Sequence, residues 1–527
     1  MTETRTNWID RVIDYVAPLY AARRAKARMF TAAANAYVGA SRSKRSLASW
    51  NPRAGSADDA LVWDLPTLRD RSHDLMRNTP LARGAVNTTV TNVVGPGLKL
   101  QARIDRAALG MDDEQAEEWE AHTEREWRLF SERTEIDITR TSTFAELQEL
   151  AFRSTLVGGD AFAILTNLRR PGSPYNTKIQ LVEGARVTTP NDRQLTAVMV
   201  EGVEKDPDTG APVAYHIANH YPQGALLPGV KPAWVRVAAF GEKTGRRNVL
   251  HLYKRLRMDQ SRGEPYLAPV IDLCKTLDRY SEAEVMAALT QSLLTVFIKS
   301  DLGDAGLGPM LPTSETGAST SDEDIKLGSG AVVGLAPGED IAAVNPTHPN
   351  ATFDPFVMSL CRQMGVALEL PYEVLVKHFT ASYSAARAAL LEAWKFFLGR
   401  RIWLARTFCQ PVYEAFLWEA VSTGRITAPG FFSDELARMA YCGACWIGPA
   451  KGMINELDEV KAARERLDAG LSTLDEETAQ LTGGDWEQNH QQQVKEHKAR
   501  KEAELDAEDA PATPRQTTMP NDQKDLA

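Results

Sequence analysis

The hydrophobic period of this chain changes twice, and these changes constrain its fold class. Before the pair Gly158-Gly159, apolar residues recur at helical spacing. From residue 160 to about residue 254, short runs rich in Val, Ile, Leu and Ala alternate with turn clusters, as in strands. Helical spacing returns at Pro265, so we predict an α+β, mainly helical fold. Helices are expected early in the chain at residues 65–78, 80–93, 114–130 and 143–157, and late in the chain at about residues 453–468 and 475–481.

Local signals indicate several boundaries. Thr143 followed by Glu146 predicts a capping box that opens a helix. The run Asp206-Pro-Asp-Thr-Gly210 predicts a hairpin turn. Pro411 predicts a kink in a helix that runs from Ser384 to about residue 423. Strands are expected at residues 161–165, 178–182, 195–203, 213–217, 234–239, 249–252 and 331–335.

Composition bounds the function class. The 527 residues correspond to about three or four domains. A formal net charge of −10 argues against a protein that coats nucleic acid, because such domains are usually basic. It does not argue against a protein past which nucleic acid slides. Five Cys without framework spacing predict reduced thiols and no disulfide. Cys442-Gly-Ala-Cys445 lacks a second pair and favours buried structural thiols over a zinc site.

The chain shows no signal for a membrane. Residues 1–20 carry charges throughout, unlike a secretory signal. The longest apolar run, residues 285–298, is interrupted and shorter than the about 20 residues that cross a bilayer. Residues 15–57 contain eight basic and no acidic residues. This segment is expected to be either a solvated flexible arm or a specific binding arm. The composition from residue 504 onward is typical of a disordered tail.

We find no catalytic, cofactor or metal motif and predict that the chain is not an enzyme. Gly241-Glu-Lys-Thr244 has the end of a P-loop without its upstream glycine. The nine His are scattered, and no nucleophile elbow or His-Glu-x-x-His accompanies them. The aromatic residues of the helix after Ser384 are expected in the core rather than stacked on nucleobases; they are Trp394, Phe397, Trp403 and Phe408.

The stretch from Gly365 to Trp394 predicts a loop held for contact. A short apolar helix ends before Pro371, a small polar segment follows, and an Ala-rich helix begins at a Ser with cap character. Two helices would therefore hold the loop rigidly.

Several segments together carry a family resemblance. They are Arg69 to Ala85, Asn92 to Gln101, Arg262-Gly-Glu-Pro265 to Val270, Leu370 to Leu375, Tyr383 to Arg387, Trp446 to Lys451, Gly470 to Leu474 and Gly484 to Glu487. In this order, over nearly the whole length, the chain resembles the lambda-like family of tailed-bacteriophage portal proteins.

The resemblance implies a portal fold with wing, stem, clip and crown, assembled as a ring around a central channel. It implies the following boundaries: basic N-terminal arm 1–59, wing 60–264, first stem helix 265–300, clip 301–352, second stem helix 353–369, tunnel loop 370–384, long tunnel or wing helix 385–427, crown 428–503 and disordered tail 504–527.

The resemblance also implies a function. The ring, of twelve subunits, would sit at the unique vertex of a phage capsid and pass double-stranded DNA without sequence specificity. A separate terminase motor would dock its large subunit at the clip and package the DNA, which is later ejected. Major capsid and scaffold proteins and head-completion or adaptor proteins would be further partners, with no membrane. The protein would assemble in the bacterial host cytoplasm and reside in the virion.

The implied DNA-facing residues lie in the tunnel loop. Relatives often have Asp at the position of His378 and Asn at that of Ser382, and the loop here is a residue shorter. The residues that the resemblance implies face the DNA are Lys377, His378, Thr380, Ser382, Tyr383 and Ser384.

Two alternatives stay open: another capsid-associated structural or adaptor protein, or a metal-dependent nucleic-acid-processing enzyme that uses the acidic runs 112–114 and 322–324.

Overall fold

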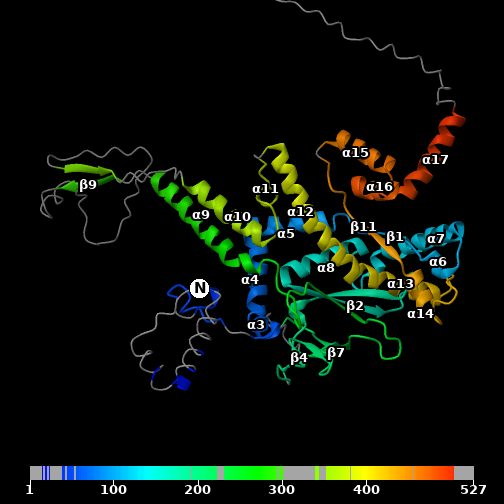
Figure 1. Ribbon diagram of the computed structural model, residues 1–527, viewed down its shortest axis with the longest axis horizontal. Coiled ribbons are helices and arrows are strands. Elements are labelled where there is room, and N and C mark those ends of the chain that lie inside the picture. Colours follow the sequence, from blue (N-terminus) through cyan, green and yellow to red (C-terminus); the bar gives the residue numbers. More distant parts are fainter. Residues whose placement is uncertain are drawn as a thin grey trace, which may run out of the picture. The chain divides into compact units, whose positions relative to one another are not determined.

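The computed structural model describes most of the chain between residues 55 and 503 (Figure 1). The gaps are 192, 222–230, 293–295, 301–338, 344–351, 380–381 and 454, and scattered residues between 15 and 52 are also described. For the described residues within 290–300 and 339–343, only the backbone is considered. The chain divides into two units, residues 1–60 and 61–527. In the first unit, a short 3-10 helix spans Val38–Ala40, and α3 (Ala57–Leu61) ends at the division.

The expected helices of the first part form, and α8 (Phe144–Gly158) begins as predicted. Thr143 Oγ1 accepts a hydrogen bond from the Glu146 amide at 3.5 Å, and Glu146 Oε2 accepts one from the Thr143 amide at 2.7 Å. The helix ends at Gly159, where φ is 88° and an added Cβ would lie 2.4 Å from the Gly263 carbonyl oxygen. The other helices here are α4 (Leu65–Asn78), α5 (Pro80–Val93), α6 (Arg106–Leu109) and α7 (Asp113–Ser131), with a 3-10 turn at Thr134–Ile136.

Two antiparallel sheets follow, with strand orders β3-β2-β8 and β4-β5-β6-β7. The single strand expected at residues 195–203 is wrong, because Glu201 and Gly202 have φ of 44° and 78° and turn the chain between β4 and β5. The other strand predictions before residue 254 are confirmed, and residues 331–335 lie outside the described part. The strands are β2 (Asp160–Asn167), β3 (Thr177–Glu183), β4 (Met199–Val200), β5 (Val203–Lys205), β6 (Pro212–Ala218), β7 (Trp234–Ala238) and β8 (Val249–Tyr253).

The predicted turn after β5 is also confirmed. Asp206 Oδ1 accepts hydrogen bonds from the amides of Asp208 and Thr209, and the Gly210 amide donates to the Asp206 carbonyl. This side-chain bonding is the reason that Asp favours such turns.

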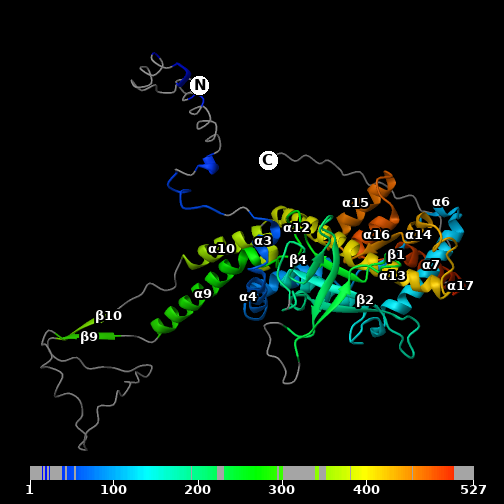
Figure 2. The ribbon, with the colours of Figure 1, turned by 90° about the horizontal axis from the view of Figure 1, so that it is seen from below.

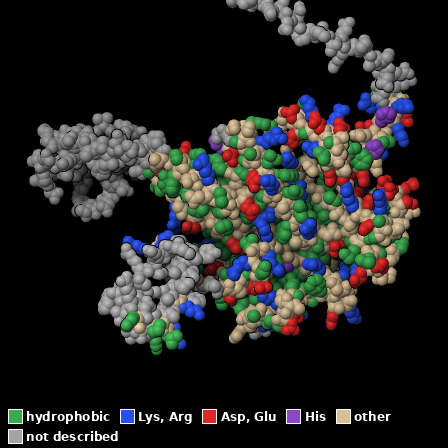
Figure 3. Space-filling model, viewed as in Figure 1, with side chains coloured by type: hydrophobic (Ala, Val, Ile, Leu, Met, Phe, Trp, Pro, Cys, Tyr) green, Lys and Arg blue, Asp and Glu red, His purple; other side chains and the backbone are tan. Residues whose placement is uncertain are grey.

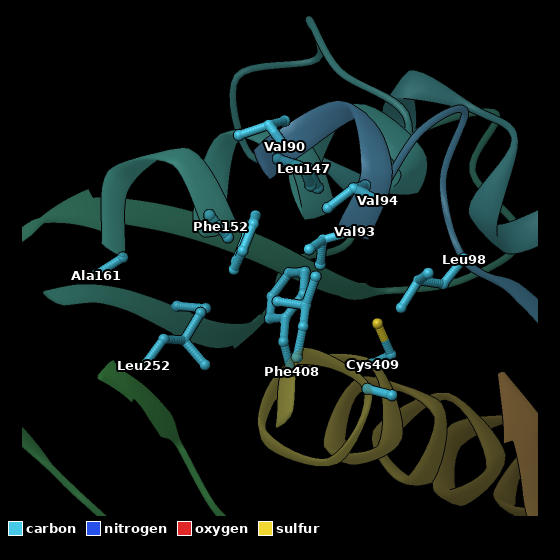
Figure 4. Close-up of a cluster of buried hydrophobic side chains, with 14 of the residues drawn as sticks. Val90, Val93, Val94, Leu98, Leu147, Phe152, Ala161, Leu252, Phe408 and Cys409 are labelled. Atoms are coloured by element: carbon cyan, nitrogen blue, oxygen red, sulfur yellow. The ribbon is translucent and has the colours of Figure 1, made fainter. Parts of the chain in front are cut away.

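Strand β2 separates two clusters of buried side chains, because neighbouring residues of a strand point to opposite faces. Phe162 packs with Tyr215 and other residues of the four-stranded sheet. Ala161 lies on the opposite side, in the main core formed with α5, α8 and β8 (Figure 4). Phe408 enters the same core and is fully buried.

The long helix after the loop is interrupted as Pro411 predicts, although by a different device. Helix α12 (Tyr383–Leu404) continues into one π-helical turn, Ala405–Cys409, and then into α13 (Gln410–Ser422). In a regular α-helix, the ring of Pro411 would clash with the carbonyl one turn earlier, and proline has no amide hydrogen to donate to it. The π turn just before Pro411 accommodates both effects.

Two helices lie side by side in both ribbon views (Figures 1 and 2). They are α9 (Ile271–Ser292) and α10 (Phe353–Ala367), and the ring of Tyr280 stacks on that of Phe353 at 5.3 Å. The expected helix over residues 265–300 is too long at both ends. At the start, Pro265 precedes a 3-10 turn, Ala268–Val270, that contains Pro269. At the end, β9 (Val296–Ser300) pairs with β10 (Glu339–Ala343).

The last part of the described chain adds a strand pair that the sequence did not predict. Strand β1 (Lys99–Ala102) pairs with β11 (Ala444–Ile447), although more than 300 residues separate them. The predicted helices at 453–468 and 475–481 are confirmed with small shifts, whereas α17 was not predicted. Residues 504–527 lie outside the described part. The helices are α14 (Glu435–Tyr441), α15 (Glu456–Asp468), α16 (Leu474–Thr482) and α17 (Trp486–Glu502).

A buried ionic network joins α4, β2, β8 and the segment before α9. Asp160 is fully buried and accepts hydrogen bonds from Arg262 at 2.6 Å and from Arg69 at 2.7 Å, and His251 Nε2 lies 3.3 Å from its carboxylate. Arg262 also donates to the carbonyls of Gly184 and Val187. Burial alone would raise the pKa of Asp160, but the two guanidinium groups hold it well below its ordinary range.

We expect the substitution Asp160→Asn to destabilise the fold by about 3–5 kcal/mol, because Arg262 would stay buried without its counter-charge. Chemical denaturation near pH 7 measures the change. Since the folded-state pKa is depressed, this stabilisation is present above the unfolded pKa of about 3.9 and is lost as the pH falls through the folded value.

The matched control is Glu392→Gln, which removes one partner of an exposed pair with Lys395. It should leave the unfolding midpoint nearly unchanged. An Asp160→Asn protein as stable as this control would contradict the role assigned to the network.

Candidate functional site

The predicted contact loop is anchored to the core immediately before it becomes exposed. After α10, Leu368 and Leu370 are each only 2% exposed. The short helix α11 (Tyr372–Val376) then buries Val374 and Leu375 in the main core. Lys377 ends α11 in the left-handed conformation, with φ of 57°. The backbone therefore enters the loop from a fixed point.

The turn between α10 and α11 is sterically tight. The Leu370 amide donates to the Gly365 carbonyl at 2.9 Å, and an added Cβ on Gly365 would lie 2.6 Å from the Leu370 carbonyl oxygen. Glu369 has φ of 55°, which is unfavourable for a residue with a Cβ. The surrounding contacts must therefore hold this conformation.

Arg400 and Tyr266 supply contacts that hold the turn. The Tyr266 hydroxyl donates a hydrogen bond to the Leu368 carbonyl. The Arg400 guanidinium lies over the rings of Tyr266 and Phe396, 5.6 Å and 5.1 Å from their centroids. Glu369 lies 3.9 Å from both the Arg400 guanidinium and the Lys254 ammonium. The strained backbone at Glu369 thus places the Glu369 carboxylate near two cations.

Arg401 anchors the end of α12 that lies farthest from the loop. Its guanidinium donates to the carbonyls of Asn92, Val93 and Pro449, at 3.0, 3.3 and 2.8 Å. Burial lowers the pKa of Arg401 to about 10. Gly448 is required beside it, since an added Cβ would lie 2.5 Å from Arg401 Nε.

Five of the six predicted DNA-facing residues are described, and all five are exposed; Thr380 lies outside the described residues. None of the five side chains forms a hydrogen bond or ion pair with another described residue. Ser382 is the N-cap of α12, although its side chain makes no cap hydrogen bond. Tyr383 is 53% exposed, and Phe379 beside the loop is 54% exposed. The loop thus presents hydroxyl, imidazole and ammonium groups to whatever lies outside. The five are Lys377, His378, Ser382, Tyr383 and Ser384.

Sequence reasoning missed the residues that support the loop. Arg400 and Arg401 stand between two apolar runs of the helix, residues 396–398 and 402–404, which is a signal that buried cations sometimes give. Nothing in the sequence indicates Tyr266 or Glu369, because their partners lie far away along the chain. These residues position the loop.

The structure bears out the prediction for the four aromatic residues and corrects the prediction for the cysteine pair. The four aromatics of α12 and the π turn do pack in or against the core, as predicted. Cys442 is mostly buried, and burial raises the pKa of its thiol to about 12. Cys445 is exposed, so the prediction of two buried thiols is wrong at that position, which lies on strand β11. Within the described residues, no group of three or more His, Cys, Asp or Glu could hold a metal ion.

No helix in the part of the chain that was described is long and apolar enough to span a bilayer. On the face in Figure 3, Lys and Arg side chains are interspersed with Asp and Glu side chains over most of the surface.

Comparison with known proteins gives consistent matches. The family model described as phage portal protein, lambda family, matches residues 43–401. Portal protein B of Escherichia phage lambda is 28% identical over 479 residues, which cover 87% of this chain and 88% of the relative. The portal protein of Escherichia phage N15 is 28% identical over 485 residues, with coverage of 87% and 89%.

Among solved structures, a chain in the neck of a native GTA particle computed with C12 symmetry is similar. The identity is 14%, the TM-score is 0.42, and the match covers 82% of this chain and 93% of that one.

The turn that anchors the loop is directly testable. We expect Gly365→Ala to destabilise the protein by about 1–3 kcal/mol, because its new methyl would press on the Leu370 carbonyl, a backbone atom that cannot move aside. Chemical denaturation of the purified protein measures this change.

Gly399→Ala in the middle of α12 is the control, since an added Cβ there meets nothing within 4 Å. It should stabilise the protein by about 0.5–1 kcal/mol, because alanine favours a helix over glycine. If both variants changed the stability equally, the turn would not be tight.

Proposed function

The chain belongs to the lambda family of phage portal proteins, and on this premise we propose that it forms a ring whose channel passes double-stranded DNA into and out of a capsid. The observation that carries this proposal is the match of the portal family model to residues 43–401. In this proposal the ring has twelve subunits and lies at the unique vertex of the capsid, as part of the virion. The subunits assemble in the bacterial host cytoplasm.

The segmentation of the chain supports a portal arrangement. We propose that residues 60–264 form the wing, that α9 and α10 form the stem, and that the segment between them forms the clip. The crown would comprise residues 428–503. Exposed apolar side chains on the stem helices suit contacts between subunits of a ring; they include Val285 and Val366.

The exposed loop around Lys377 is proposed to face the DNA. Its described side chains form no hydrogen bond or ion pair with another described residue, so their donors are available to phosphate oxygens. One ammonium per subunit is a weak contact by itself, and symmetry would repeat it around the ring. Because contacts to phosphates carry no sequence information, DNA of any sequence would pass.

Weak contact is what a translocation channel requires. Each phosphate neutralised by Lys or Arg adds affinity that must be broken as DNA advances. A net charge of −10 per subunit limits such binding. The buried residues Val374 and Leu375 keep the start of the loop at a constant position, so it confines DNA without closing on it.

The proposed partners follow from this role. Portal proteins are structural rather than catalytic, so ATP hydrolysis would come from a partner. A terminase large subunit would dock at the clip and supply it. Major capsid, scaffold and head-completion proteins would contact other faces. The alternatives are another capsid-associated structural or adaptor protein and a metal-dependent nucleic-acid-processing enzyme. A nuclease assay with Mg²⁺ tests the second.

Ring formation is the first test. Twelve chains of 58.1 kDa would give particles of about 700 kDa by light scattering, visible as rings in negative stain. A monodisperse monomer at high concentration would overturn the proposal.

The loop is tested by Lys377→Glu in phage that carries the substitution. We expect rings to assemble normally while DNase-protected DNA per particle falls several-fold, because twelve carboxylates would repel the phosphates. Quantitative PCR of protected DNA measures the effect. Lys461→Glu, an exposed residue of α15, is the matched control. If Lys377→Glu abolished ring assembly, the loop would be a subunit contact instead.

A further inference from the structure

A hollow of about 640 Å³ lies among α4, α5 and α8, apart from the loop. Its lining is strongly basic, which stands out in an acidic chain. Only one of its six lining residues, Met76, has an apolar side chain. The lining residues are Met76, Arg77, Arg83, Asn87, Thr91 and Arg153.

One face of α5 forms a wall of this hollow. Arg83, Asn87 and Thr91 are spaced four residues apart, so their side chains lie in a row on one side of the helix. Eight residues of helix span about 12 Å. A row of that length can meet more than one phosphate of a strand of duplex DNA.

The amide group of Asn87 is oriented by its neighbour. Arg153 donates to Asn87 Oδ1 at 2.6 Å and to Glu149 Oε1 at 2.8 Å. Because the amide oxygen accepts from Arg153, the amide nitrogen of Asn87 points away from it with two donors. Thr91 adds a hydroxyl one turn further on. The row therefore presents hydrogen-bond donors.

Two guanidinium groups of the hollow are uncommitted. Neither Arg77 nor Arg83 forms an ion pair or side-chain hydrogen bond with a described residue, and both are exposed. Among the residues that the structure describes, Glu149 is the one carboxylate that forms a salt bridge with an arginine of the lining. Arginine is the side chain best suited to bind phosphate through two hydrogen bonds.

We propose that this hollow, defined by Arg77, Arg83, Asn87, Thr91 and Arg153, binds the phosphodiester backbone of double-stranded DNA. The near absence of apolar side chains favours this ligand over a protein surface, since protein interfaces usually have an apolar centre. The inference rests on the proposed function and adds a DNA contact outside the loop. Binding is independent of sequence, because every contact is to phosphate.

The test compares the full-length wild-type chain with the double variant Arg77→Glu/Arg83→Glu. The probe is a fluorescent 30-base-pair duplex, and anisotropy is recorded over a range of NaCl concentrations. We expect affinity at 0.1 M NaCl to fall at least about tenfold, and the slope of log K against log salt to decrease by about 1.8, the value for two lost phosphate contacts.

Arg125→Glu/Lys461→Glu is the control, with the same change of charge at two exposed residues outside the hollow. It should retain most of the wild-type salt slope. Equal losses in the two double variants would overturn the inference, because net charge alone would then explain them. Inorganic phosphate at 10 mM should compete only weakly with the duplex; full displacement would indicate a site for free phosphate and overturn the assignment to DNA.

Negative stain of the same samples separates this inference from the proposed function. If the wild type forms rings and the Arg77→Glu/Arg83→Glu variant does not, the hollow is a contact between subunits and the inference fails. If the variant forms rings and binds DNA as the wild type does, the inference also fails while the portal function stands. If the wild type forms no rings, the portal proposal itself fails.

Discussion

The fully buried carboxylate of Asp160 constrains the surrounding structure more than any other single group. It lies at the first residue of β2, directly after the glycine that ends α8. A buried carboxylate without partners would be very costly, so Arg262 and Arg69 must both reach it. Arg262 in turn donates to the backbone carbonyls of Gly184 and Val187, after β3, and of Glu201, between β4 and β5. One charge therefore fixes the relative placement of a helix, two sheets and the segment that leads to α9.

The loop depends indirectly on this network. Gly263, next to Arg262, packs against Gly159 so closely that neither position allows a side chain. Three residues later, the Tyr266 amide donates to the Leu156 carbonyl, and the Tyr266 hydroxyl donates to the Leu368 carbonyl at the base of the loop. A continuous set of contacts thus runs from the buried carboxylate to the turn before α11. The exposed residues of the loop contribute nothing to this framework, which leaves them available for contacts with other molecules.

Sequence reasoning succeeded where the signal was local. The capping box at Thr143, the turn at Asp206 and the amphipathic helices depend on residues within a few positions of one another. It failed where distant segments meet. The pairing of β1 with β11 joins short runs with no strong strand pattern, and the turn at Glu201 required the approach of Thr188 to Gly202. The helix expected through residue 300 ended earlier, since the β-branched residues of β9 found a partner strand.

The sequence by itself determined the mainly helical α+β class, the position of the exposed loop and the resemblance to portal proteins, because periodicity and ordered motifs survive without coordinates. Only the tertiary structure decided what holds the loop and where the basic hollow lies. Arg400, Arg401 and Tyr266 act through partners up to about 300 residues away, and Arg77, Arg83 and Arg153 come from three helices. Such groupings depend on packing in three dimensions, which no local pattern of residues encodes.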